Sequence, residues 1–334
     1  MQFSLSSIRH RFAAPAAGAL RAMPVGAWLR REEAIMGTAM RVELWSESRS
    51  DGEAAISAVM SEMHRIDRTM SPHKPTSELS IVNRLATSRA VAISAEMARL
   101  IDRARHFSEL SDGAFDITYA SVGHLYDYRQ RVRPSDEQLA RAREAIGYRH
   151  LVLDTDARTV RFAREGMRID LGGFAKGHAV DNSVAILRRH GIEHAMVSAG
   201  GDSRVIGDRR GRPWTIAIRD PRREAEVVAV LPLEDVSIST SGDYERYFEQ
   251  GGVRFHHLID PRTGKSPDGV RSVTILAPDG LTSEGLSKTV FVLGAQRGLA
   301  LIETLNDVDA VIVDSSGALH FSSGLLAGTS PTRQ

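Results

Sequence analysis

The segment LVLDTDARTVRFA, residues 151–163, contains two runs of β-type residues on either side of the turn-forming residues DTDA. Two such runs around a short polar turn predict a β-hairpin. Further runs of this kind, separated by Gly, Pro or Asp, are AMVSAG (195–200), WTIAIRD (214–220), VVAVLPL (227–233), SISTS (237–241), FHHLID (255–260) and SVTILAP (272–278). Since few helices intervene, neighbouring strands are expected to pair in an antiparallel or mixed sheet with peripheral helices. This predicts an α+β fold rather than a doubly wound nucleotide fold.

The first half of the sequence is dominated by helical periodicity. MRVELW (40–45) predicts one strand, and Asp51 is the expected cap of the helix that follows it. A second helix is expected from Ser94, and a third begins at the capping box SDEQ (135–138) and stops at Gly147. In the second half, helices are expected only at 174–190 and near 284–305.

The N-terminal segment differs from the rest of the chain. Residues 1–30 contain arginines and small residues, but their longest uncharged run is too short for a signal-peptide core. We expect a disordered leader there, or a start codon placed upstream of the folded domain. The expected domain covers 31–325, helix-rich over 31–150 and sheet-rich over 151–325, with a tail at 326–334. As written, the chain is expected to be soluble and cytoplasmic, and a misassigned start would allow a periplasmic location.

Composition excludes several classes of function. The 334 residues include 43 basic and 42 acidic ones, so a net charge of +1 gives no field that favours nucleic acid or an anionic membrane. The sequence has no cysteine, which excludes disulfides, thiolate metal sites, a cysteine nucleophile and a lipidated N-terminal cysteine. No apolar stretch approaches the roughly 20 residues that a transmembrane helix needs. These features favour a small-molecule or protein partner.

The segment IDLGGFAKGHAVD, residues 169–181, is a short apolar run followed by paired glycines, a lysine and the start of a helix. Glycines at this position let backbone amides approach an anion, and the helix N-terminus adds positive potential. The spacing matches neither a P-loop nor a dinucleotide-binding fingerprint. Taken alone, the segment therefore fits either a phosphate-binding loop or ordinary turn chemistry.

The order of motifs favours the phosphate-binding interpretation. MGT (36–38), MSPHKPTSELSIVN (70–83), DGAFDIT (112–118), DLGGFAKGHAVD (170–181), SAGGDSRVIG (198–207), STSGDYERYF (239–248) and HHLIDPRTGKSP (256–267) follow one another along the chain. In this order they resemble the FAD:protein FMN transferase family, often called ApbE-like, over about 36–310. The resemblance implies a T-fold-like architecture of two subdomains. It also implies an enzyme that transfers FMN from FAD to a serine or threonine of an acceptor protein, usually with magnesium.

Several residues are implied as flavin contacts by this resemblance. Asp170 and Lys176 correspond to flavin-nucleotide contacts, and Met36 packs against a ring. The implied cofactor-binding set also includes His73, Ala114, Phe115, Asp116, Ser241, Gly242 and Leu258. On composition alone, Phe115 and Met36 are more typical of an ordinary core, and the SGD run at 241–243 is equally typical of a helix cap.

The histidine pair in HHLID (256–260) supplies a candidate general base. The implied reaction needs a hydroxyl that loses its proton as it attacks phosphorus, and histidine has a pKa suited to accepting it. Because side chains alternate along a strand, His256 and His257 are expected to face opposite sides. We take His257 as the catalytic base, together with Lys176 as the cation at the diphosphate. Arg262 is expected to orient the following turn or to be a solvated turn residue.

The segment SEGLSKTVFVLG (283–294) departs from the family pattern. In the family, an aspartate and a threonine four residues later bind the metal together with a backbone carbonyl of the glycine loop. Here Glu284 and Lys288 occupy those positions. Either Glu284 and the Gly173 carbonyl hold Mg²⁺ in a shifted site, or Lys288 itself supplies the positive charge and pairs with Glu284. A plain helical salt bridge also fits this spacing.

Three functions follow as alternatives. The first is transfer of FMN from FAD to a Ser or Thr hydroxyl of an acceptor flavoprotein, a membrane or soluble redox protein, with release of AMP. The second is metal-dependent hydrolysis of the FAD pyrophosphate to FMN and AMP. The third is storage or delivery of FAD without chemistry.

Overall fold

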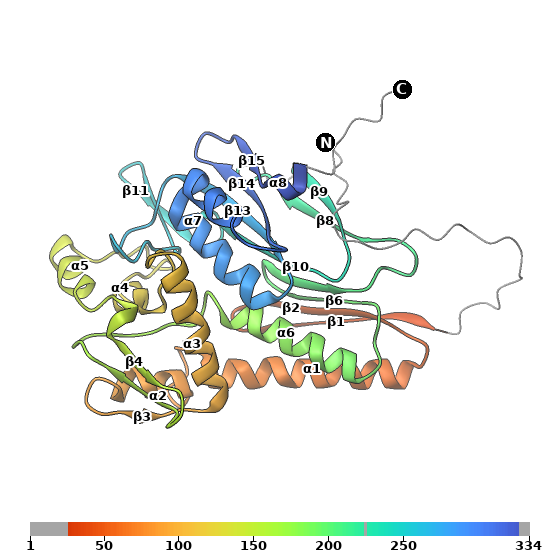
Figure 1. The fold of residues 1–334 in the computed structure, drawn as a ribbon, viewed down its shortest axis with the longest axis horizontal. Coiled ribbons are helices and arrows are strands. Elements are labelled where there is room, and N and C mark those ends of the chain that lie inside the picture. Colours follow the sequence, from red (N-terminus) through yellow and green to blue (C-terminus); the bar gives the residue numbers. More distant parts are fainter. Residues whose placement is uncertain (1–25, 224–225, 327–334) are drawn as a thin grey trace, which may run out of the picture.

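The computed structural model describes residues 26–223 and 226–326, and its main element is an eight-stranded sheet (Figure 1). The strand order is β1-β2-β6-β7-β10-β13-β14-β15, and every neighbouring pair is antiparallel. The strands are β1 Ala27–Ile35, β2 Thr38–Ser46, β6 Ala195–Ala199, β7 Asp202–Ile206, β10 Ser237–Gly242, β13 Val270–Ala277, β14 Asp309–Asp314 and β15 Leu319–Phe321. The α+β prediction is therefore confirmed.

Three long helices cover one face of this sheet: α1 (Arg49–Met70), α6 (Ala175–Arg189) and α7 (Gly280–Ile302) (Figure 1). Alternation along β13 explains the layering. Val273 and Ile275 belong to the core that includes residues of α7, whereas Leu276 joins a separate core on the opposite face. That face is covered by the hairpin β8 (Trp214–Arg219) and β9 (Val227–Leu233).

A second group of elements packs beside the sheet, and its own small sheet has the order β3-β5-β4 (Figure 1). The elements are α2 Glu78–Leu85, β3 Val91–Ala92, α3 Ala95–Leu110, the 3₁₀ helices Ile117–Tyr119 and Tyr148–His150, α4 Ala120–Gly123, α5 Asp136–Arg143, β4 Leu151–Asp154 and β5 Thr159–Phe162. The hairpin β11 (Tyr247–Gln250) and β12 (Val253–His256) and the short helix α8 (Ser323–Leu326) complete the described chain.

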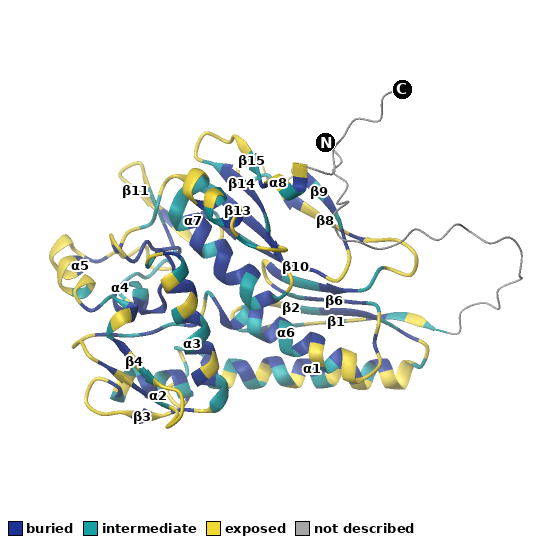
Figure 2. Cartoon of the chain, in the orientation of Figure 1, coloured by how far each residue is buried: buried dark blue, intermediate teal, exposed yellow. Residues whose placement is uncertain are grey.

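Figure 2 shows the strands of the large sheet and the inner faces of α6 and α7 mostly buried, with exposed residues along the outer face of α1 and in the loops. This is the pattern expected of helices with one apolar stripe against a sheet. None of the helices in the described ranges combines the length and apolarity needed to cross a bilayer.

Local sequence signals located most elements, and the differences have simple causes. The 151–163 hairpin and the capping box of Ser135 and Gln138 form as expected. The prediction that Asp51 caps the first helix was wrong, because Ser48 is the N-cap of α1 and its side chain accepts the N–H of Asp51. The α5 helix ends at Arg143 rather than at Gly147.

Three further expectations concern the ends of segments. Most of the expected leader lies outside the described residues, but its last residues, from Ala27, belong to β1. The helix-cap alternative for residues 241–243 was wrong, because Ser241 and Gly242 end strand β10. The helix α7 begins at Gly280 and is interrupted at Gly294, whose φ of 81° is not helical.

Candidate functional site

The glycine turn before α6 shapes the start of the site. Asp170 accepts the N–H of Gly172 at 2.5 Å, which closes the turn, and the first residues of α6 follow at Ala175. No side chain of the preceding residue caps this helix. Instead, Glu284 of α7 accepts the N–H of Gly177 at 2.7 Å, so a carboxylate from another helix neutralises the positive helix end.

Four charged side chains from three elements meet next to this turn. We call Lys176 (α6), Asp202 (β7), Glu284 and Lys288 (both α7) the lysine–carboxylate cluster. Lys176 Nζ lies 2.9 Å from Asp202 Oδ2 and contacts Glu284 Oε1 as well. Lys288 Nζ lies 3.4 Å from Glu284 Oε1 and 3.9 Å from Asp202 Oδ1.

Burial makes these ion pairs strong. The side chain of Glu284 is fully buried and that of Asp202 is 3% exposed. Burial alone lowers the pKa of Lys176, but Asp202 and Glu284 more than offset it, so the pKa is raised. Burial acts against ionised Asp202 too, yet Lys176 and Lys288 hold its pKa below the usual value. In the lysine–carboxylate cluster, two carboxylate groups are therefore balanced by two ammonium groups.

The two helices that carry the cluster approach each other at a pair of glycines. A Cβ built on Gly177 would lie 2.5 Å from the Gly280 carbonyl carbon, so only glycine allows this spacing. Asp181, one turn later on α6, accepts the backbone N–H groups of Gly280 and Leu281 at 2.8 and 3.0 Å. It also pairs with Arg204 at 2.6 Å. Asp181 thus fixes the N-terminus of α7 against α6.

The two histidines at the end of β12 have different surroundings. His256, the last residue of β12, is buried against the edge of Phe291, and its Nε2 lies 2.8 Å from the Pro267 carbonyl oxygen. The buried Nδ1 atoms of both histidines lack a hydrogen-bond partner among the described residues. Burial and then the charge of Lys288 lower the pKa of His257 to about 3, so its ring is neutral at physiological pH. His256 is thus engaged through its Nε2, and His257 is the candidate general base of the pair.

Asp170 links the glycine turn to the loop that carries His73. Burial raises the pKa of Asp170, and its hydrogen bond with Gly172 and the charges of His73, Lys176 and Arg246 act against this rise. The charges of both segments therefore act on one carboxyl group. His73 itself is exposed, and Met36 is half-buried with a φ of 53°, packed against two of the hydrophobic cores.

The residues Ala114, Phe115 and Asp116 lie in the interior. Ala114 and Phe115 are buried, and the Phe115 ring packs against Phe107 and Phe174 with centroids 5.8 and 5.6 Å apart. Both oxygens of Asp116 are engaged: Oδ1 accepts from Thr118, and Oδ2 accepts the N–H of Tyr148 at 2.7 Å. The contacts seen for these residues are core and turn contacts.

Strand β10 supplies a buried hydroxyl beside the cluster. Ser241 Oγ lies 2.9 Å from Ser287 Oγ of α7, next to Lys288 in sequence. A Cβ on Gly242 would clash with the Tyr244 ring, so this glycine leaves room for that ring. Leu258, after the histidine pair, is buried.

Sequence reasoning missed Asp202 and Asp181, although both lie in motifs quoted above. In SAGGDSRVIG, Asp202 directly follows the two glycines, and the nearest cation in the sequence is Arg204. The partners of Asp202 are instead Lys176 and Lys288, which lie far from it in the sequence, so its pairing gives no local signal.

The residues present do not fit the expected metal site. The oxygen of Glu284 that faces the cluster already contacts two ammonium groups, and the other accepts a backbone N–H. An ammonium group has no lone pair for a metal. Two unit charges 4 Å apart repel by about 4 kcal/mol at an effective dielectric of 20, and a divalent cation doubles this. In the described ranges, no group of three or more His, Asp or Glu side chains has an arrangement suited to a metal ion.

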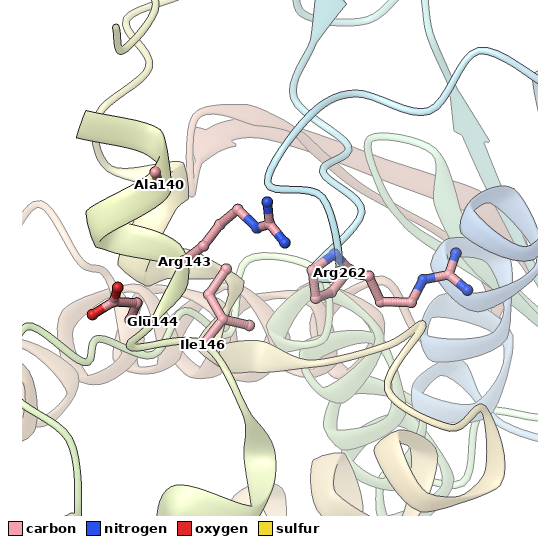
Figure 3. A pocket seen from close by; sticks show the side chains of 6 residues that line it. Ala140, Arg143, Glu144, Ile146 and Arg262 are labelled. Carbon is pink, nitrogen blue, oxygen red and sulfur yellow. The ribbon is translucent and has the colours of Figure 1, made fainter. Parts of the chain in front are cut away.

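Arg262 lies apart from this site. Its guanidinium pairs with Asp260 at 2.9 Å and thereby orients the turn. This is the first of the two alternatives that the sequence left open for Arg262. A shallow pocket between this turn and the end of α5 is lined by Ala140, Arg143, Glu144, Ile146, Pro261 and Arg262 (Figure 3).

Together, the fold and the site define an α+β protein in which a glycine turn and two lysines meet at the start of one helix, and the charges of both lysines act on a neutral histidine. The family model described as "ApbE family" matches residues 36–312, and the chain belongs to this family. A FAD:protein FMN transferase of Treponema pallidum is 31% identical over 89% of this chain and 87% of its own length. One from Vibrio cholerae is 34% identical over 75% of this chain and 76% of its own.

Solved structures agree with these sequence comparisons. The ApbE protein of Thermotoga maritima superposes with a TM-score of 0.84 at 33% identity, covering 91% of this chain and all of that one. The flavin transferase ApbE from Vibrio cholerae gives a TM-score of 0.82 at 29% identity, covering 91% of this chain and 99% of its own.

Proposed function

We propose that this protein is a FAD:protein FMN transferase. The hydroxyl oxygen of a Ser or Thr in an acceptor protein attacks the FMN phosphorus of FAD. A new oxygen–phosphorus bond forms, the bond from that phosphorus to the bridging oxygen breaks, and AMP leaves with that oxygen. The hydroxyl proton passes to the imidazole of His257. FAD is the substrate, and the acceptor becomes a covalent flavoprotein.

One observation carries this proposal: the glycine turn with Lys176, the helix start with Glu284 and Lys288, and the neutral ring of His257 lie together. A diphosphate needs positive charge and amide donors, and the attacking hydroxyl needs a proton acceptor next to them. The relatives in sequence are FAD:protein FMN transferases, which supports the same activity.

The flavin half of FAD is assigned to the side of the site formed by Asp170, His73 and Met36. Asp170 is surrounded by groups from the glycine turn and the His73 loop, and it is suited to accept a hydrogen bond from a flavin or ribityl group. The imidazole of His73 is exposed and free to stack on a ring. Ala114, Phe115, Asp116 and Leu258 support this wall from the core.

The proposed reaction does not use magnesium. Gly173 and Glu284 remain the residues from which a shifted metal site would be built, but the ammonium groups of Lys176 and Lys288 contact the Glu284 oxygen that such a site needs. The positive charge that stabilises the departing phosphate comes, in this proposal, from the lysines.

The experiment compares transfer, hydrolysis and storage directly. The purified chain is incubated with FAD and a protein extract of the source cells; AMP and free FMN are quantified, and denatured proteins are inspected for flavin fluorescence. We expect fluorescent protein bands with AMP released in equal amount. Free FMN without labelled protein would indicate hydrolysis, and bound but unchanged FAD would indicate storage.

A His257→Asn variant tests the assigned base. Loss of general-base assistance is expected to slow transfer by about 10²–10⁴-fold while FAD affinity changes little. His64→Asn is the matched control, because His64 lies on the outer side of α1 and, among the residues that the structure describes, pairs only with Glu33. Wild-type transfer by the His257 variant would contradict the assignment.

A further inference from the structure

The sequence uses lysine at only four positions, 74, 176, 265 and 288, although it contains 43 basic residues. Two of these four lysines belong to the lysine–carboxylate cluster. An ammonium is a compact point charge, whereas a guanidinium is a broad fork. In a chain that otherwise uses arginine, the site thus contains two small cations.

The stem of Lys288 lies against the glycine turn. A Cβ on Gly173 would lie 3.6 Å from both Cγ and Cε of Lys288, which is ordinary van der Waals contact. The Lys288 side chain therefore packs against the backbone that is assigned to the diphosphate. Its salt bridge with Glu284, 3.4 Å long, holds it there.

The charge of the Lys288 ammonium acts on the assigned base. After burial, Lys288 is the strongest influence that lowers the pKa of His257. The reacting phosphorus must lie between the base and the groups that stabilise the phosphate oxygens. Lys288 packs against the Gly173 turn and its charge acts on His257, so it is the cation best placed to reach those oxygens.

Glu284 and Asp202 are already neutralised without a metal. Their two negative charges are balanced by Lys176 and Lys288 at 2.9 to 3.9 Å, besides the closer contact of Lys176 with Glu284. Bringing a divalent cation to Glu284 would require Lys288 to move away from both carboxylates.

Resting on the proposed transfer of FMN, we infer that Lys288 takes the place of the divalent cation: its ammonium binds the FAD diphosphate, and the reaction needs no Mg²⁺. Lys288 is then a catalytic residue, because it touches the reacting phosphate. Asp202 and Glu284 are positioning residues that act through it.

The first test measures transfer and metal binding by the full chain. The fluorescent-band assay is run with metal-free extract, once with chelator and once with millimolar Mg²⁺, and the rates are expected to agree within about twofold. Separately, Mn²⁺ is titrated in the presence of FAD and followed by electron paramagnetic resonance. No Mn²⁺ binding beyond that of FAD alone is expected. A rate that rises tenfold or more with Mg²⁺, or protein-dependent binding of Mn²⁺, would overturn the inference.

Substitutions at Lys288 give the second test. Lys288→Met is expected to lower the metal-free rate by about 10²-fold or more, as removal of one charge-stabilising group does. Lys288→Thr is expected to regain rate with Mg²⁺ and to bind Mn²⁺ when FAD is present. Lys265→Met is the matched control, because Lys265 is exposed in a turn and has no ion pair within the described ranges. A Lys288→Met variant that folds and keeps the wild-type metal-free rate would refute the assignment.

The two readouts separate this inference from the proposed function. If no condition gives labelled protein, the transferase proposal fails, and the Mn²⁺ titration of wild type and Lys288→Thr still decides whether Lys288 excludes a cation. If labelling succeeds but only with Mg²⁺, the transferase proposal stands and the inference fails.

Discussion

Replacement of Gly177 by alanine is expected to disturb the site from the helix crossing. The added Cβ would lie 2.5 Å from the Gly280 carbonyl carbon and 3.0 Å from the Leu281 nitrogen. Ordinary contact needs about 3.5 Å or more, so α6 and α7 must separate by about 1 Å. Both opposing groups are backbone, and no side chain is available to rotate away.

The expected loss of stability follows from this shift. Overpacking costs about 1–3 kcal/mol, and the better helix propensity of alanine returns up to about 1 kcal/mol, which leaves a net loss of about 2 kcal/mol at such a backbone clash. With an unfolding entropy of about 2.1 cal/mol/K per residue over about 300 residues, this lowers Tm by about 3 °C. The 2.7 Å bond from the Gly177 N–H to Glu284 would also lengthen.

Calorimetry and the transfer assay measure the two consequences. A displacement of about 1 Å at a reacting centre can cost about 10²-fold in rate, so we expect the variant to lose far more activity than its stability loss explains. Gly269→Ala is the control, because a Cβ there meets nothing within 4 Å. A Gly177→Ala protein with unchanged Tm and full activity would show that the close approach does not set the site.

Three further predictions concern other groups. The pKa of His257 is lowered to about 3, so its proton-accepting form persists down to that pH. The value of kcat/KM should therefore change less than about twofold between pH 5.5 and 7.5. An inflection near pH 6.5 in the profile of kcat/KM would contradict this prediction. Phe174→Ala removes a fully buried ring and should lower the free energy of unfolding by about 3–5 kcal/mol in urea titrations, unless the surrounding rings collapse into the space. Asp181→Asn removes the carboxylate shared by the start of α7 and Arg204 and should cost about 1–3 kcal/mol, measured in the same way; a loss below 0.5 kcal/mol would show that Asp181 does not fix α7.

Local features of the fold were predictable from the sequence. The capping box at Ser135 has a fixed spacing, and the 151–163 hairpin combines two β-type runs with a polar turn, so each is specified within a few residues. The strand β1 was not predicted, because four consecutive charged residues interrupt its stretch AWLRREEAI and only two of its nine residues are buried. Its pairing with β2, which depends on the tertiary fold, makes it a strand.

The candidate site was predictable only in its parts. Lys176, His257 and Glu284 stand in motifs that carry the resemblance. That Lys176 binds Asp202, or that Asp181 holds α7, depends on which strands and helices meet, and sequence patterning of period 2 or 3.6 contains no such pairing information. The sequence likewise could not decide between a shifted metal site and a cation supplied by Lys288. The contacts of Lys288 and Glu284, which bear on this choice, depend on the tertiary structure.

The lysine–carboxylate cluster combines residues that lie far apart in the sequence. Its members Lys176, Asp202 and Lys288 span more than a hundred residues. A proteolytic fragment that ends before α7 would therefore keep the glycine turn, Lys176 and Asp202 but lose Glu284 and Lys288, and we expect it to have no affinity for the dinucleotide. Occupancy by FAD would then report completion of the whole fold. By mass action, FAD at about 100 times its Kd would stabilise the intact chain by about 2.7 kcal/mol, and such a fragment would gain nothing.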